Sequence, residues 1–178
     1  MDTLNRALVV IDYQNDFVIG SMGCADALAL EPLIFDKVSE AIDNGEDVYF
    51  TRDTHKADEY MESAEGRKYP VMHCIEGTDG CEIFGRLRRL STECNVITKD
   101  TYGSVDLAKR LQALGYAEVE LCGVVTNICV IANAILIKTL MPECNVVVNP
   151  DLVASGDREL GESALNVMAS LGITVLGR

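Results

Sequence analysis

Three side chains that together could perform nucleophilic catalysis follow short apolar segments in this sequence. Asp12 and Lys99 each come directly after such a segment, and Cys129 follows a third one by a short turn. A carboxylate that is partly desolvated at the end of a buried strand has a raised pKa, which suits a general base. A lysine charge beside a cysteine favours the thiolate, which is the nucleophilic form. These residue types predict a carboxylate, an ammonium and a thiol acting at one site.

Each of these residues also has a purely structural interpretation. Asp12 could cap the turn after its strand, although Asp16 is the more natural residue for that, and a lysine beyond a strand end is commonly solvated. Burial as a small apolar side chain is the expected role of the other six cysteines. Cys129 differs because Thr126 or Asn127 could cap a helix that begins here. The start of that helix would lower the thiol pKa and offer backbone N–H groups to an oxyanion.

Alternating apolar patterns predict the elements that must bring these residues together. Short apolar runs indicate buried strands, and apolar positions at helical spacing followed by glycine indicate helices. The predicted strands are Ala7–Ile11, Asp47–Thr51, Asn95–Thr98, Glu118–Cys122, Asn145–Val148 and Ile173–Leu176. The predicted helices are Leu33–Ile42, a short one around Ile83–Leu90, Val105–Leu114, Asn127–Leu140 and Arg158–Leu171. Residues 53–82 are polar and irregular, and they are expected to form a long functional loop.

This alternation predicts an α/β fold of three layers, in which helices cover both faces of a six-stranded, mainly parallel, Rossmann-like sheet. We expect one domain over residues 1–178, because a chain of this length can bury a sufficient core. Ligands of such sheets bind at the carboxyl ends of the strands. Asp12, Lys99 and Cys129 are all expected at that edge.

Composition excludes several classes of partner. The net charge of −13 argues against nucleic acid and against anionic membrane surfaces. It fits a small neutral or cationic ligand, although solubility alone explains it equally well. The seven cysteines include no C-x-x-C pair, which excludes a zinc ribbon and is typical of a reducing compartment. No apolar run has the length of a membrane span or the pattern of a signal peptide, so a cytoplasmic location is expected.

Three segments together resemble one known family. The runs VVIDYQNDF, VITKDTYGS and CGVVTNICV resemble the signature segments of the isochorismatase-like cysteine hydrolases, the superfamily of the nicotinamidases, and the resemblance spans nearly the whole chain. It implies hydrolysis of a small-molecule amide by Asp12, Lys99 and Cys129. Asp12 would exchange protons with the thiol, Lys99 would hold both partners, and Cys129 would form a thioester.

The resemblance also implies how the substrate is held. The oxyanion hole would use the backbone N–H groups of Val125 and Cys129, and the peptide bond between Val124 and Val125 would be cis. Phe17 lies where the family places an aromatic ring against the substrate, although a core role is the alternative. Tyr102 is expected to line the same pocket.

The long loop contains the two histidines of the chain, His55 and His73, and Asp53 lies at its start. A carboxylate and two imidazoles suit zinc, manganese or iron, whereas spacing alone favours two solvated histidines. The placement resembles the metal site of the nicotinamidases, whose ion orients the pyridine nitrogen of the substrate. It implies a divalent cation, with zinc as the first choice, held by Asp53, His55, His73 and a fourth ligand. Glu65 is the preferred fourth ligand, with Glu62 as the second choice.

Several functions therefore compete. The first is nicotinamidase-type deamidation, which the segment HCIEGTDG favours, although Thr54 stands where typical nicotinamidases have tryptophan. The second is a metal-free amidase of N-carbamoyl or ureido compounds with the same catalytic group, and the third is a non-catalytic ligand-binding relative. Cleavage of a vinyl ether, as in true isochorismatases, is disfavoured because those relatives lack the nucleophilic cysteine. The family often forms dimers or tetramers, so a homo-oligomer is expected.

Overall fold

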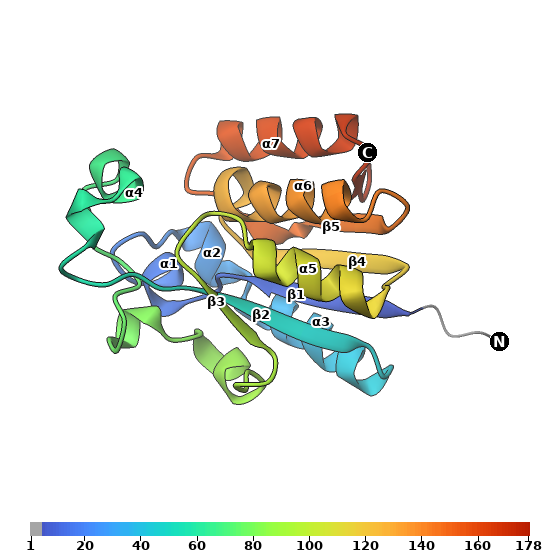
Figure 1. The fold of residues 1–178 in the computed structure, drawn as a ribbon, viewed down its shortest axis with the longest axis horizontal. Coiled ribbons are helices and arrows are strands. Elements are labelled where there is room, and N and C mark those ends of the chain that lie inside the picture. Colours follow the sequence, from blue (N-terminus) through green and yellow to red (C-terminus); the bar gives the residue numbers. More distant parts are fainter. Residues whose placement is uncertain (1–4) are drawn as a thin grey trace.

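Six parallel strands form one sheet in the computed structural model, which describes residues 5–178 (Figure 1). The strands are β1 (Arg6–Ile11), β2 (Asp47–Asp53), β3 (Val96–Lys99), β4 (Glu118–Val124), β5 (Asn145–Ala154) and β6 (Thr174–Val175). Their order across the sheet is β3-β2-β1-β4-β5-β6, and every pair of neighbours is parallel. The predicted fold class is confirmed.

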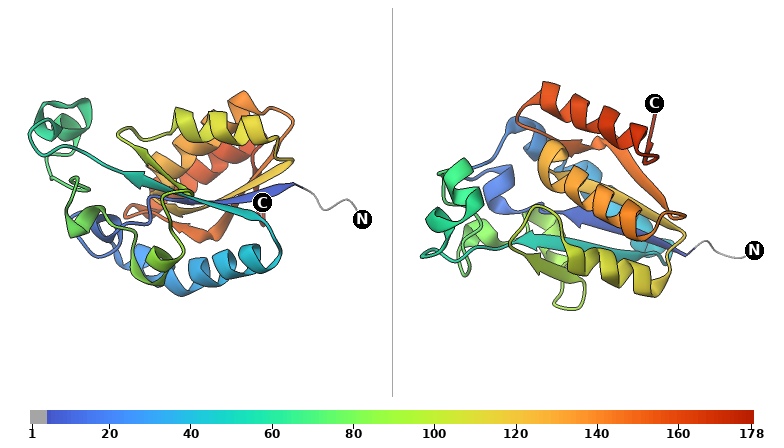
Figure 2. Two further views of the ribbon diagram at one scale, coloured as in Figure 1. Left: turned by 60° about the horizontal axis from the view of Figure 1, so that its bottom comes forward. Right: turned by 45° about the horizontal axis from the view of Figure 1, so that its top comes forward.

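Helices cover both faces of this sheet, with α5, α6 and α7 on one side and α3 on the other (Figure 2). The α-helices are α1 (Asn15–Val18), α2 (Ala25–Ala29), α3 (Glu31–Asp43), α4 (Ala64–Lys68), α5 (Val105–Leu114), α6 (Ile131–Leu140) and α7 (Arg158–Ser170). Three 3₁₀ helices, η1 (Tyr60–Glu62), η2 (Asp79–Cys81) and η3 (Gly85–Arg89), and the π-helical turn η4 (Thr126–Val130) complete the set. Among residues 5–178, no helix is long and apolar enough to cross a membrane.

The central strand β1 shows why the chain folds as a covered sheet. Val9 and Ile11 pack into the core beneath α5, α6 and α7, whereas Leu8 and Val10 pack into the core on the α3 side. All four are fully buried, because successive side chains of a strand point to opposite faces and both faces are covered. A central strand such as β1 therefore requires apolar side chains at every one of these positions.

The strand β5 is longer than predicted. Asn149 and Pro150 are typical turn residues, so the prediction ended the strand at Val148, yet β5 continues to Ala154. The pairing of β4 with β5 shifts register between Leu121 and Gly123, which marks a bulge. A bulge interrupts the hydrogen-bond ladder and lets a proline lie within a strand.

Two further predictions need correction. The segment 53–82 is not wholly irregular, since it holds η1, α4 and η2, and the helix predicted around Ile83–Leu90 is the 3₁₀ helix η3. The helix predicted from Asn127 begins instead as the π-helical turn η4, and no side chain caps it. The Oδ1 atom of Asn127 accepts a hydrogen bond from Ser155 at 2.6 Å.

Gly123 allows β4 to lie against β1 at the edge where the candidate site forms. Its φ of +107° lies in a region that side chains rarely adopt. A Cβ atom at this position would lie 2.2 Å from the carbonyl oxygen of Ile11, the residue that precedes Asp12. The backbone at the end of β1 therefore requires glycine beside it.

We expect the substitution Gly123→Ala to lower the free energy of unfolding by at least about 3 kcal/mol, because both the φ angle and the contact with Ile11 oppose a methyl group. Gly45→Ala is the matched control. Gly45 also has a positive φ, +74°, but nothing lies within 4 Å of its missing Cβ, so a loss of about 1–2 kcal/mol is expected. Urea unfolding of the three proteins measures the difference, and equal losses in both variants would contradict it.

Candidate active site

The sheet order brings four predicted residues to one edge. Lys99 ends β3, Asp53 ends β2, and these two are register partners. Asp12 follows β1, whose partner β4 leads into the turn that carries Cys129. All four positions lie at the carboxyl ends of neighbouring strands, where ligands of parallel sheets bind.

Asp12, Lys99 and Cys129 come together as the sequence predicts. The Nζ atom of Lys99 lies 2.7 Å from Oδ2 of Asp12 and 3.9 Å from Sγ of Cys129. All three residues are buried, and the Asp12 carboxylate is fully inaccessible to solvent. The charges therefore interact at short range in a region that water does not screen.

Thr51, which sequence reasoning missed, fixes the carboxylate of Asp12. Its hydroxyl accepts the backbone N–H of Asp12 at 3.0 Å and donates to Oδ1 at 2.6 Å. Asp12 also has a positive φ of 45°, which turns the chain sharply after β1. With Oδ1 held by Thr51, Oδ2 is the oxygen that faces Lys99. Its place at the end of the predicted strand Asp47–Thr51 was the available signal.

The electrostatics of this group follow from burial and mutual contact. Burial raises the pKa of Asp12 above its ordinary value, although the Lys99 ammonium opposes this. Burial would lower the pKa of Lys99, but Asp12, Cys129 and Asp53 together raise it, so its side chain stays protonated. Burial, helped by the Asp12 carboxylate, raises the pKa of Cys129 well above its usual range. This direction is opposite to that expected from the start of a helix alone, so Cys129 is at rest a thiol beside a base.

The turn before Cys129 has the shape that the family resemblance implies. The peptide bond between Val124 and Val125 is cis. Within residues 5–178, the N–H of Val125 donates to no other backbone group, whereas its carbonyl accepts from Ile128 and Val130. Val125 therefore precedes the π-helical turn and Cys129 lies within it.

A second cluster contains the four residues predicted to hold a metal ion. Asp53, His55, Glu65 and His73 each offer one ligand atom, and these atoms all lie within 4.8 Å of one another. Glu65 comes from α4, which lies beyond the carboxyl ends of the strands (Figure 1). Glu62, the second choice for the fourth ligand, is exposed and lies outside the cluster.

The chemistry of this cluster fits a divalent cation. Nε2 of His73 is buried and has no hydrogen-bond partner, while its Nδ1 contacts the Val71 carbonyl at 2.9 Å and the Tyr60 hydroxyl at 3.2 Å. A histidine held at one nitrogen and free at the other is typical of metal ligands. Two imidazoles with two carboxylates suit zinc and related ions. The four residues therefore form a candidate metal site.

The metal cluster and the catalytic group share one residue. The Lys99 ammonium, which contacts Asp12 and Cys129, also donates to Oδ1 of Asp53 at 3.3 Å. The backbone N–H of Asp53 is bound by the side-chain oxygen of Gln14 at 2.8 Å, and the Gln14 amide donates to the Asp53 carbonyl at 2.8 Å. Sequence reasoning missed Gln14, which gave no signal beyond its place after Asp12.

Aromatic rings surround these two clusters. The ring of Phe17 is buried and lies 5.2 Å from that of His73, and Tyr60, also missed, lies 5.1 Å from the ring of His55. Tyr102 is half-buried and packs against the core that includes Cys129. Phe17 therefore lies beside the metal cluster, whereas Tyr102 belongs to the core that also contains the nucleophile.

Comparison with known proteins agrees with this geometry. The family model of the isochorismatase domain matches residues 6–178. A curated relative, an isochorismatase family protein of Bacillus subtilis described as uncharacterized, is 32% identical and covers 97% of this chain and 99% of its own. A solved nicotinamidase from Bacillus subtilis superposes with a TM-score of 0.85 at 32% identity, covering 97% of this chain and 99% of its own.

Two further solved structures differ in their chemistry. A pyrazinamidase of Pyrococcus horikoshii in complex with zinc has a TM-score of 0.82 at 28% identity and covers 97% of this chain and 98% of its own. An N-carbamoylsarcosine amidase of Thermoplasma acidophilum has a TM-score of 0.77 at 25% identity and covers 97% and 95%. With the family model matching nearly every residue, this protein belongs to the isochorismatase family and is a hydrolase of amide C–N bonds.

Proposed function

We propose that this protein is a cysteine amidohydrolase of the nicotinamidase type, which converts nicotinamide or a similar small amide to the acid and ammonia. The observation that carries the proposal is the shared Lys99, which places the thiol–carboxylate pair directly beside the Asp53 metal cluster. A small aromatic amide could then bring its carbonyl to Cys129 while its ring nitrogen meets the metal site. The Bacillus and Pyrococcus relatives support this assignment by their names.

The residues define a sequence of proton transfers. Asp12 takes the thiol proton of Cys129 as the sulfur attacks the amide carbon, and the Lys99 ammonium stabilises the negative charge that remains on the pair. The backbone N–H groups of Val125 and Cys129 would bind the oxyanion of the tetrahedral intermediate. Asp12 then donates its proton to the departing nitrogen, which leaves as ammonia and yields a thioester on Cys129.

The second half of the reaction reuses the same base. Asp12 takes a proton from water as the water oxygen attacks the thioester carbon, and the carbon–sulfur bond breaks with return of the proton to Cys129. The acid is released. Asp53, His55, Glu65 and His73 would hold the divalent metal, for which zinc is the first choice, and the ion when bound supplies a Lewis-acid site for a substrate nitrogen.

The second candidate is an amidase of N-carbamoyl or ureido compounds. It is favoured by the similarity to the N-carbamoylsarcosine amidase of Thermoplasma acidophilum. The metal cluster discriminates between the two, because a metal-free amidase has no need of two buried histidines beside two carboxylates. Ammonia release from N-carbamoylsarcosine, with none from nicotinamide, would favour this alternative.

We expect the metal-loaded protein to release ammonia from nicotinamide, and we expect Cys129→Ala to lower kcat by about 10³-fold or more, because the nucleophile is lost. Cys144→Ala is the matched control, since Cys144 is a buried cysteine directly before β5, at the amino ends of the strands, whereas the site lies at their carboxyl ends. It should retain its turnover. A coupled assay for ammonia measures both, and equal activity in the wild type and Cys129→Ala would rule out the covalent mechanism.

Removal and return of the metal test the second cluster. Zinc added to chelator-treated protein at 100 times its Kd should stabilise the fold by about 2.7 kcal/mol, because it binds the folded state. Glu65→Ala should weaken zinc binding at least about tenfold, whereas the neighbouring exposed Glu62→Ala should leave it unchanged. Thermal unfolding and elemental analysis give the two readouts. Loss of zinc in Glu62→Ala with retention in Glu65→Ala would reverse the ligand assignment.

A further inference from the structure

Asn133 is a buried amide in a helix that is otherwise apolar on its inner face. It is fully inaccessible in α6, where Ala134 and Ile137 also point inward. Burial of an amide is unfavourable unless its polar atoms are bonded. Its Nδ2 donates to the carbonyl of Cys129 at 2.8 Å and to the carbonyl of Tyr102 at 3.2 Å. One side chain thus joins the nucleophile's backbone to that of a pocket residue.

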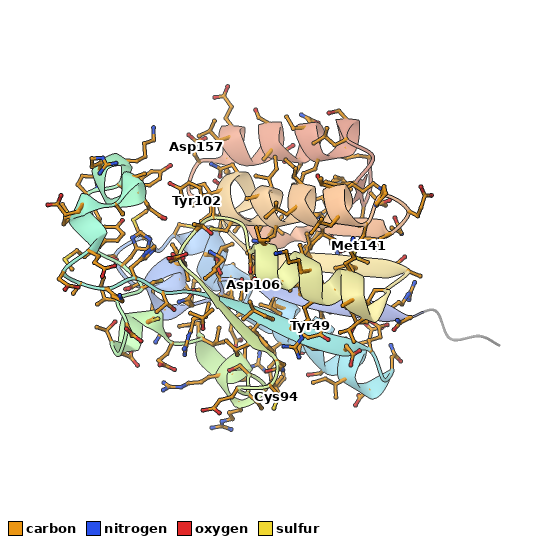
Figure 3. The ribbon with its side chains drawn as sticks, viewed as in Figure 1. Tyr49, Cys94, Tyr102, Asp106, Met141 and Asp157 are labelled. Atoms are coloured by element: carbon orange, nitrogen blue, oxygen red, sulfur yellow. The ribbon has the colours of Figure 1, made fainter. Side chains whose placement is uncertain are left out.

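Tyr102 lies in the loop between β3 and α5, and the residues that follow it in this loop contact α6. Oδ1 of Asn133 accepts the backbone N–H of Ser104 at 2.9 Å. A Cβ atom at Gly103 would lie 2.6 Å from Cδ1 of Leu136 and 3.3 Å from the carbonyl of Ala132, so glycine lets the loop lie directly on the helix. Figure 3 labels Tyr102 in this loop, at the end of the molecule where α6 begins. The chain is therefore held at the carbonyl of Tyr102 and at the two residues that follow it.

The side chain of Tyr102 is half-buried against the core on the α5–α6 face of the sheet. It packs against the apolar core that contains Cys129. Burial raises the pKa of Tyr102 to about 12, and the charges of Glu65, Tyr69 and Cys129 contribute in the same direction. The phenol is therefore a neutral, half-buried side chain.

We propose that Asn133 is a positioning residue, which fixes the backbone of Tyr102 relative to that of Cys129 through its hydrogen bonds to both and thereby sets the fit of the substrate. This inference rests on the proposed function, because its first test uses nicotinamide as the substrate. Asn133 touches no reacting atom. Its effect on the reaction passes through Tyr102.

Two variants perturb this tether in different ways. Asn133→Asp keeps the side-chain volume and the acceptor for Ser104, but it removes both donors. Gly103→Ala presses a methyl group against the Leu136 side chain and the Ala132 carbonyl and leaves Asn133 intact. This second variant keeps the test open if a buried aspartate impairs folding. Each is combined with Tyr102→Ala in a double-mutant cycle, which measures whether the first residue acts through the second.

Tyr116→Phe is the matched control for the loss of buried hydrogen bonds. The Tyr116 hydroxyl is bonded to Asp47 at 2.6 Å and to Tyr49 at 2.8 Å. Tyr49 lies on β2, away from the loop that carries Tyr102 (Figure 3). This variant should lower thermal stability and leave KM and kcat unchanged.

The readout is the division of the effect between KM and kcat. Asn133→Asp and Gly103→Ala should each raise KM for nicotinamide about tenfold and change kcat less than about threefold, because the catalytic group is intact. In the Tyr102→Ala background, each should add less than about twofold. An equal effect with and without the Tyr102 side chain would overturn the proposal, and so would a KM that stays within twofold of the wild type.

A second assay, which needs no substrate, separates failure of the proposed function from failure of the role proposed for Asn133. If the wild type releases no ammonia from nicotinamide, the same cycle is measured by the alkylation rate of Cys129 with iodoacetamide, followed by peptide mass spectrometry. Because Tyr102 packs on the core around the buried thiol, Tyr102→Ala and Asn133→Asp should each accelerate alkylation about tenfold, with no further gain in the double variant. An alkylation rate that Asn133→Asp does not change would refute the tether whatever the substrate.

Discussion

The buried ammonium of Lys99 is the interaction on which the rest of the site depends. It lies 2.7 Å from Asp12, 3.3 Å from Asp53 and 3.9 Å from Cys129, and hardly any of its side chain is accessible. Desolvation of an isolated charge costs several kcal/mol, and removal of one partner from a buried pair typically costs about 3–5 kcal/mol. The ammonium of Lys99 therefore offsets the cost of burying the carboxylates of Asp12 and Asp53, and the two carboxylates offset the cost of burying the ammonium.

The balance of charge explains why a cation suits this place. Asp12, Asp53 and Glu65 face one ammonium, and the two histidines are neutral when they act as ligands. Three carboxylates and one ammonium leave a net charge of −2. A bound divalent cation would neutralise this charge and would also satisfy the ligand atoms. The unpartnered Nε2 of His73 points to the same conclusion from hydrogen bonding alone.

Sequence patterns predicted the helices and strands that have a clear apolar periodicity, and the site residues that lie at strand ends. The helix Val105–Leu114 and its terminal Gly115 were predicted with their observed bounds, because an amphipathic helix and a left-handed glycine leave a local signal. The seven residues predicted at the two clusters lie together. Parallel strands bring Asp12, Asp53 and Lys99 to one edge of the sheet, and segments beyond that edge supply the other four. The roles of these residues remain predictions.

What the sequence did not reveal depends on contacts between distant segments. Thr51, Gln14 and Asn133 lie 39, 39 and 29 residues from partners that they hold by hydrogen bonds, and no local pattern reports such pairing. The extension of β5 past Pro150 needs a bulge that only its pairing with β4 specifies. The predicted lowering of the Cys129 pKa was also wrong. Burial in the tertiary fold raises this pKa by more than the start of a helix lowers it.

The resting state of the nucleophile follows from the same constraint. A thiol whose pKa is raised is protected from adventitious oxidation and alkylation, since the thiolate is the reactive form. In the proposed mechanism, Asp12 accepts the proton of this thiol while the Lys99 charge stabilises the pair. Asp12 can do so because burial raises its pKa towards that of a useful base and Thr51 occupies its other oxygen. Because the ammonium that assists the thiol is also bound to Asp53, changes at the metal cluster reach the nucleophile through one nitrogen atom. The proposed mechanism therefore couples substrate binding to chemistry through the same ammonium that pairs with both buried carboxylates.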